Sequence, residues 1–161
     1  MEDKVPSFFR FEDLRVYGKA VDYNTWLIKA LHNANSESEK CLCNSFVHSA
    51  MDIALNIVEG SSRSKSQFDH YLKVAKSALR ECVTHTSLAN GVGLLSDEDC
   101  ERSRELLMEL TRMIGALIIS LQRGSRRTRE GGYGISSMQD DTDDINTEDS
   151  DFDSSFDEMN S

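Results

Sequence analysis

The feature that most restricts the fold is a stretch of more than a hundred residues, from Asp13 to Arg123, that contains no proline and few glycines. Along it, apolar residues recur at steps of three and four, as on one face of an α-helix, instead of alternating as in a half-buried strand. Proline inside a helix costs about 3 kcal/mol, so a proline-free stretch with this spacing is typical of long helices. We therefore predict an all-α protein.

Three polar or glycine-containing breaks divide the stretch into four helices: Asn33–Ser36, Gly60–Ser62 and Gly91–Gly93. Ser64 or Ser66 can cap the third helix. The predicted core stripes are Leu14, Tyr17, Val21, Ile28 and Leu31 in the first helix; Phe46, Ala50, Ile53 and Ile57 in the second, with a further stripe of Val47, Met51, Ala54 and Val58; Phe68, Leu72, Ala75, Leu79, Cys82, Thr86 and Ala89 in the third; and Leu106, Leu110, Met113, Leu117 and Leu121 in the fourth, widened by Leu107, Ile114 and Ile118.

Helices of this length with short connections predict an antiparallel up-down four-helix bundle. The second and fourth helices are apolar over more than one stripe, whereas each helix of a lone bundle buries only one. The surplus predicts a homo-oligomer.

The charge is concentrated at one end of the chain. There are 28 Asp and Glu against 18 Lys and Arg, for a net charge of −10, but residues 133–161 hold ten of the acids and none of the bases. Such a segment, poor in apolar residues, buries too little surface to offset the entropy of ordering. The predicted layout is an N-terminal arm (1–10), the bundle (11–123), a basic then glycine-rich linker (124–134) and a disordered acidic tail (135–161).

Several classes of protein are disfavoured. No window has the roughly 18 to 20 uninterrupted apolar residues that span a bilayer, and the first residues lack the order of a signal peptide. We expect a cytoplasmic protein without membrane contact, whose four cysteines (Cys41, Cys43, Cys82, Cys100) remain thiols.

Four segments carry a resemblance: Phe11–Ala20 (FEDLRVYGKA), Asn56–Arg63 (NIVEGSSR), Phe68–Glu81 (FDHYLKVAKSALRE) and Arg112–Leu121 (RMIGALIISL). In order and spacing they resemble the four-helix-bundle family that includes proteins encoded in 23S ribosomal RNA intervening sequences and the accessory variability determinant of diversity-generating retroelements. The resemblance implies a homopentameric ring and, for the retroelement members, binding to a reverse transcriptase and to nucleic acid. Its signature positions here are Asn56, Glu59, Gly60 and Glu81.

Glu59 lies in the last turn of its predicted helix, where the helix dipole disfavours an acid by roughly 0.3 to 1 kcal/mol. It should therefore have a partner, for which Arg63, Lys65 or the free N–H groups of the third helix are in reach. We interpret it as a structural staple rather than a catalytic carboxylate, with Asn56 bonding across the bundle and Gly60 in the left-handed position that ends the helix.

No pattern indicates a catalytic centre, a metal or a cofactor. Cys82 and His85 share a helical face, but the other histidines are scattered and a metal site needs three or four convergent ligands. There is no glycine-rich phosphate loop and no nucleophile motif. We expect a protein that is not an enzyme.

Basic residues suggest where a partner binds. The third helix repeats Lys65, Lys73, Lys76 and Arg80 with Asp69 among them and Arg63 at its entrance, on a face opposite its core stripe; a second patch comprises Arg123, Arg126, Arg127 and Arg129. These faces either bind a polyanion or a protein partner, or are only solvated.

The tail has three interpretations. Phe152 and Phe156 lie among acids, a composition of short docking motifs. The tail could instead serve solubility, or act as a polyanion mimic that covers the basic band of its own chain.

Together these features predict a non-enzymatic, ring-forming adaptor that binds a nucleoprotein or structured RNA or DNA, with a reverse-transcriptase accessory subunit as the specific case. The alternative is a structural or chaperone-like homo-oligomer without nucleic-acid binding.

Overall fold

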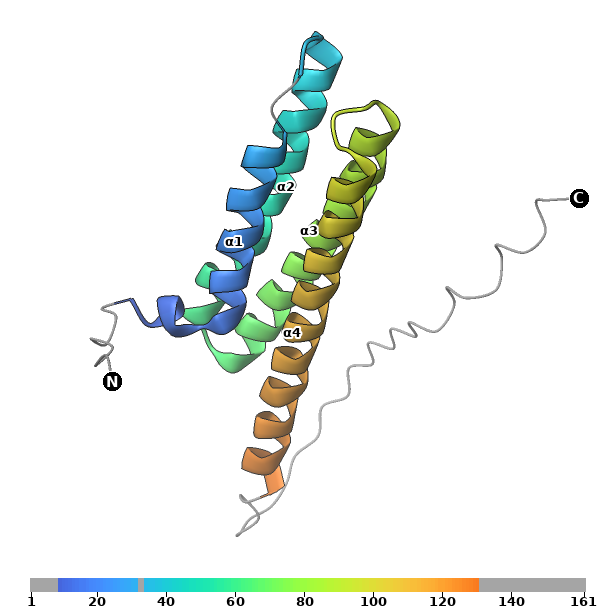
Figure 1. Ribbon diagram of the computed structural model, residues 1–161. Coiled ribbons are helices and arrows are strands. Elements are labelled where there is room, and N and C mark those ends of the chain that lie inside the picture. Colours follow the sequence, from blue (N-terminus) through green and yellow to red (C-terminus); the bar gives the residue numbers. More distant parts are fainter. Residues whose placement is uncertain (1–8, 32–33, 131–161) are drawn as a thin grey trace, which may run out of the picture.

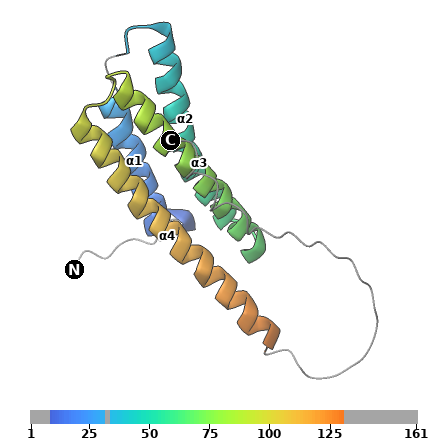
Figure 2. The ribbon, with the colours of Figure 1, turned by 90° about the vertical axis from the view of Figure 1, so that its right-hand side faces the viewer.

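The computed structural model describes residues 9–31 and 34–130, and of residues 125–130 only the helical backbone. A short 3₁₀ helix, η1 (Arg10–Asp13), precedes α1 (Arg15–Ala30), α2 (Glu37–Ser61), α3 (Lys65–Gly91) and α4 (Asp97–Glu130). Consecutive helices run antiparallel and α4 returns beside α1 (Figures 1 and 2). The predicted all-α four-helix bundle is confirmed, whereas the predicted acidic tail lies outside the described residues.

Side chains cap the starts of three helices, and at α4 the cap is Ser96, whose Oγ accepts from the backbone N–H of Asp99 (3.0 Å). Ser36 and Glu39 form a capping box at α2, and Ser64 and Gln67 form one at α3, which identifies Ser64 rather than Ser66 as the cap. Hydrogen bonds from the backbone N–H groups of Asn35 and Ser36 lower the pKa of Glu39 below its usual range. These caps satisfy N–H groups that a helix start leaves unpaired.

The core follows the predicted stripes in α2 and α3. Phe46, Ala50, Ile53 and Ile57 are buried, as are the predicted α3 residues other than the half-buried Phe68. In α4 the buried centre is Leu107, Leu110 and Ile114, while Leu106, Met113, Leu117 and Leu121 flank it half-buried. Leu107 and Ile114, which widen the predicted stripe, therefore mark the side of α4 that faces the core.

The predicted core stripe of the first helix is correct at Leu14, Tyr17 and Leu31, which pack half-buried against the core, and wrong at Val21 and Ile28. The buried residues are Val16, Ala20, Tyr23 and Leu27, and the predicted Val21 and Ile28 are exposed. The core instead takes a small alanine and a hydrogen-bonded tyrosine. Asn24, which interrupts the predicted stripe, donates from Nδ2 to the carbonyls of Ala20 (2.8 Å) and Ala50 (2.9 Å), and so joins α1 to α2.

The fourth helix continues past the predicted boundary at residue 123 and takes up the start of the predicted linker, ending at Glu130. The arginines of this segment are good helix formers, and the cost of Gly124 in a helix is only about 1 kcal/mol. Figures 1 and 2 show that this end of α4 projects beyond the other helices.

Three buried hydroxyl groups connect α1, α3 and α4. Thr86 Oγ1 donates to the carbonyl of Cys82 (2.8 Å), so its single proton is used and Ser103 Oγ must donate to Thr86 Oγ1 (2.8 Å). Ser103 has then no proton left, and Tyr23 must donate to Ser103 (3.0 Å). Burial raises the pKa of Tyr23 well above its ordinary value, which keeps the phenol a donor.

This direction of donation predicts unequal effects of removing one oxygen. Tyr23→Phe removes the terminal donor and should cost about 1 kcal/mol, because Ser103 and Thr86 keep their acceptors. Ser103→Ala leaves the buried Tyr23 hydroxyl without an acceptor and should cost about 1 to 3 kcal/mol. Urea unfolding of both variants measures the difference, and a Tyr23→Phe cost above that of Ser103→Ala would contradict the assignment.

Candidate functional site

The signature residues lie where α2 meets α3. Arg63 donates from Nε to Glu59 Oε1 at 2.9 Å and contacts the same oxygen through Nη2, which identifies Arg63 as the partner among the three that the sequence left open. Both side chains are about half exposed, so the pair adds at most about 1 kcal/mol. Ser49 Oγ donates to Glu81 Oε2 at 2.8 Å and ties α2 to α3.

Two predictions for this region are wrong. Asn56 does not bond across the bundle: its Nδ2 donates to the carbonyl of Asp52 (2.8 Å), one turn back in the same helix. Gly60 is not in the left-handed region but within α2, which ends at Ser61. Its role is close approach, because an added Cβ would lie 2.7 Å from Phe68 Cδ2 and 2.8 Å from Tyr71 Cβ.

The thiols and histidines do not converge on a reactive centre. Burial raises the pKa of the Cys82 thiol to about 12, helped by Glu81 and Asp52, so it is protonated at neutral pH. The ring of His85 packs against Phe46, with centroids 5.5 Å apart. Within residues 9–31 and 34–130, no three His, Cys, Asp or Glu side chains come together as metal ligands.

The basic residues of α3 lie along its contact with α4, not opposite the core as predicted. Gln122 Nε2 donates to Asp69 Oδ1 (3.2 Å) and Arg104 Nη2 donates to Ser87 Oγ (2.8 Å), which fixes the sides on which the two helices meet. Between these two contacts, residues that follow at steps of three and four lie on the same side of each helix. On α3 these are Lys73, Lys76, Arg80 and Val83, and on α4 they are Met108, Thr111, Gly115 and Ile119.

We call Lys65, Lys73, Lys76, Arg80 and Arg104 the basic seam. Asp69 is the acid that lies between Lys65 and Lys73 on the same side of α3. Lys73 Nζ pairs with Asp69 Oδ2 at 2.8 Å. The side chains of Lys76 and Arg80 form no ion pair with any residue of the described chain. The seam therefore keeps a net positive charge.

The other predicted basic residues do not join the seam. Arg63 is held by Glu59 at the α2–α3 connection. Arg123 is exposed on α4, and Arg126 and Arg127 lie in its projecting end, where the structure describes the backbone alone. Phe152 and Phe156 lie outside the described residues.

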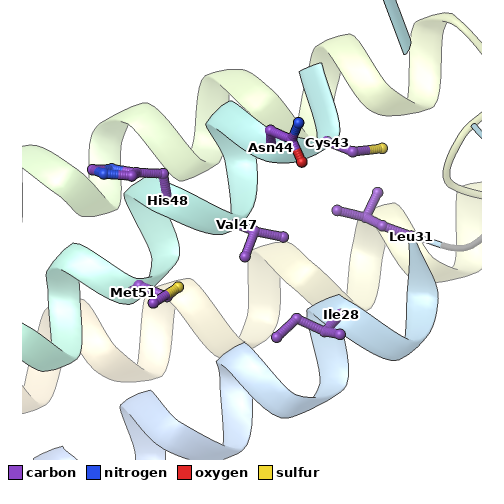
Figure 3. Close-up of a pocket in the computed structure, with 7 residues that line it drawn as sticks. All are labelled: Ile28, Leu31, Cys43, Asn44, Val47, His48 and Met51. Carbon is purple, nitrogen blue, oxygen red and sulfur yellow. The ribbon is translucent and has the colours of Figure 1, made fainter. Parts of the chain in front are cut away.

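The opposite edge of the bundle, between α1 and α2, is apolar. We call the following residues the apolar strip: Val21 and Ile28 of α1, Leu31 at the C-cap of α1, and Val47, Met51 and Leu55 of α2. Ile28 is 55% exposed, Met51 46% and Leu55 56%. Figure 3 shows the groove in this strip, where Val47 of α2 lies across from Ile28 of α1 and from Leu31, which follows that helix.

The strip also explains the hydropathy of α2. This helix is long and apolar enough, by length and composition, to cross a membrane, but core helices pass the same test. Only 28% of its most apolar window is buried inside the bundle. The large apolar side chains of α2 that remain exposed are Met51 and Leu55.

The fold and these two edges define a class of protein: a small antiparallel helical bundle with an uncovered apolar strip on one edge and a basic seam on the other. The chain belongs to the 23S rRNA-intervening sequence protein family, whose model matches residues 12–116. A search of curated proteins finds no match.

Sequence reasoning missed part of both edges. The α1 half of the apolar strip was placed in the core, although the Val16, Ala20, Tyr23 and Leu27 spacing is an equally regular stripe. The α4 side of the basic seam was missed because Arg104 and its neighbour Arg102 stand among acids, which gives no basic run along the sequence. The spacing of three and four residues from Arg104 to Gln122 indicates that the two side chains share one side of α4, and this pattern could have revealed Arg104.

Proposed function

We propose that the protein is a non-enzymatic adaptor that assembles into a ring through the apolar strip and binds structured nucleic acid or a nucleoprotein along the basic seam. The observation that carries this function is the placement of the two features on opposite edges of one bundle. Self-association through α1 and α2 leaves α3 and α4 exposed in every copy.

Repetition makes the seam a better ligand for phosphates than one copy suggests. Each copy offers Lys65, Lys76 and Arg80 without an acid partner among the described residues. A ring repeats these charges around its outside, and several phosphate contacts together give affinity that falls steeply with salt. The retroelement resemblance adds a reverse transcriptase with its nucleic acid as the partner that such a ring would serve.

The test is binding of fluorescent RNA and single-stranded DNA, followed by anisotropy over a salt titration. In the full chain, Lys73→Gln with Arg80→Gln should weaken binding to both and make the salt dependence shallower by about one unit for each phosphate that the protein no longer neutralises. The control, Lys29→Gln with Lys40→Gln, makes the same charge change at the far end of the bundle and should leave binding unchanged.

Equal loss of affinity in both variants would mean that the attraction is not at the seam. An intact protein that assembles yet binds neither nucleic acid at low salt would favour the second candidate, a structural homo-oligomer. The pairing of Asp69 with Lys73 and Gln122 is the observation that speaks for this candidate, because it neutralises part of the seam within the chain.

A further inference from the structure

The basic seam is apolar as well as charged. Val83 of α3 and Met108 and Ile119 of α4 lie among its cations at the helical steps given above, and all three are exposed. A ligand made only of phosphates would leave these side chains in water. A segment that alternates acids with apolar side chains would cover both kinds of group.

The chain itself contains such a segment. Residues 133–161 carry ten acids and no Lys or Arg, and place Phe152, Phe156 and Met159 among them. Their composition matches the seam in both respects, charge of the opposite sign and large apolar side chains at intervals.

The end of α4 also brings this segment to the correct place. Gln122 bonds to Asp69, and an added Cβ on Gly124 would lie 3.4 Å from Lys65 Nζ, so the C-terminal end of α4 passes the start of α3. The remainder of the chain therefore begins at the end of the bundle where Lys65 and Lys73 lie.

The lengths agree. From Lys65 to Arg80 the seam extends roughly 22 Å, at 1.5 Å per helical residue. Phe152 follows Glu130 by about twenty residues, and a random coil of that length has a root-mean-square reach of roughly 25 Å. The segment starts at Glu130, about 9 Å along α4 beyond Gly124, so Arg80 lies about 31 Å from its start. This distance exceeds the root-mean-square reach but is well below the extended length of about 70 Å, so Phe152 and Phe156 can reach the seam as far as Arg80.

We propose that residues 135–161 dock on the basic seam of their own chain, with acids against Lys73, Lys76 and Arg80 and the phenylalanines against Met108 and Ile119. The docking itself does not depend on the proposed nucleic-acid binding. Its consequence for regulation does: the tail would compete with a nucleic acid for the same residues.

The docking is tested in the intact chain by zero-length carbodiimide cross-linking, which joins lysine amines to carboxylates in direct contact, followed by peptide mass spectrometry. Tail acids should cross-link to Lys65, Lys73 and Lys76 and not to the control lysines Lys19, Lys29 and Lys40, and the yield should fall as salt screens the attraction. Equal yields at both sets of lysines, or no tail cross-links, would overturn the proposal.

A variant distinguishes docking of the phenylalanines from charge attraction alone. Phe152→Ser with Phe156→Ser keeps every tail acid, and it should lower the cross-linking yield at Lys73 and Lys76. An unchanged yield would contradict the apolar part of the proposal.

The competition is tested separately by replacing the tail acids at 151, 153, 157 and 158 with their amides. If the tail has a Kd of about 0.1 mM and a millimolar effective concentration, relief of competition should tighten RNA binding about tenfold at low salt. An unchanged affinity would overturn the competition. If neither protein binds nucleic acid, the proposed function fails while the cross-linking result still decides the docking.

Discussion

Ile28→Asp combined with Met51→Asp should convert the assembled protein into folded monomers. Both side chains are about half exposed in the bundle, so a single chain tolerates the charges. Between two copies the same carboxylates would be buried without partners, and burying an unpaired charge costs several kcal/mol. Light scattering measures the mass, and circular dichroism reports whether the helices remain.

The matched control is Leu88→Asp with Val92→Asp, which adds the same two charges on comparably exposed apolar residues at the end of α3, outside the strip. It should remain assembled. If both variants become monomeric, or both remain assembled, the strip is not the interface. Val47 and Val58 are less suitable than Met51, because they are half-buried and a charge there would also strain the bundle.

Gly60→Leu should destabilise the fold by about 3 kcal/mol or more. The first added carbon already falls within 2.8 Å of both Phe68 and Tyr71, and one of those contacts is to the Cβ of Tyr71, which cannot rotate away. Overpacking of this kind typically costs about 1 to 3 kcal/mol or more, and exceeds the gain of roughly 0.5 to 1 kcal/mol from removing a helical glycine.

Gly18→Leu is the control for helix propensity. Gly18 is also within a helix, but an added Cβ there has no atom within 4 Å. This variant should be stabilised by roughly 0.5 to 1 kcal/mol. Chemical unfolding should thus give changes of opposite sign at the two glycines, and a stabilised Gly60→Leu would contradict the close packing of α2 on α3.

The fold was predictable because the chain from Asp13 to Arg123 has helical apolar spacing without proline, and because clear breaks divide it into four helices. In α3 the steps from Leu72 to Ala89 leave no alternative side for the core. In α1 two stripes compete, and the more hydrophobic one, with Val21 and Ile28, lies on the surface. Periodicity shows that a helix has an apolar face but not whether its own bundle or another molecule covers it.

The polar details depended on neighbours that a sequence does not show. Glu59 has its partner four residues away, so the ion pair with Arg63 could be predicted. Tyr23, Thr86 and Ser103 come from different helices, and only their packing together reveals the chain of hydroxyl groups. Gly60 was given the common role of a helix-ending glycine, but the approach of Phe68 and Tyr71 determines it.

The central claim is that this bundle is one copy of an assembly formed through the apolar strip. The most direct measurement is the molar mass of the intact protein by size-exclusion chromatography with multi-angle light scattering, at micromolar concentration and moderate salt. We expect a mass close to five times the chain mass of 18.1 kDa. A mass near 18.1 kDa across that concentration range would contradict the claim.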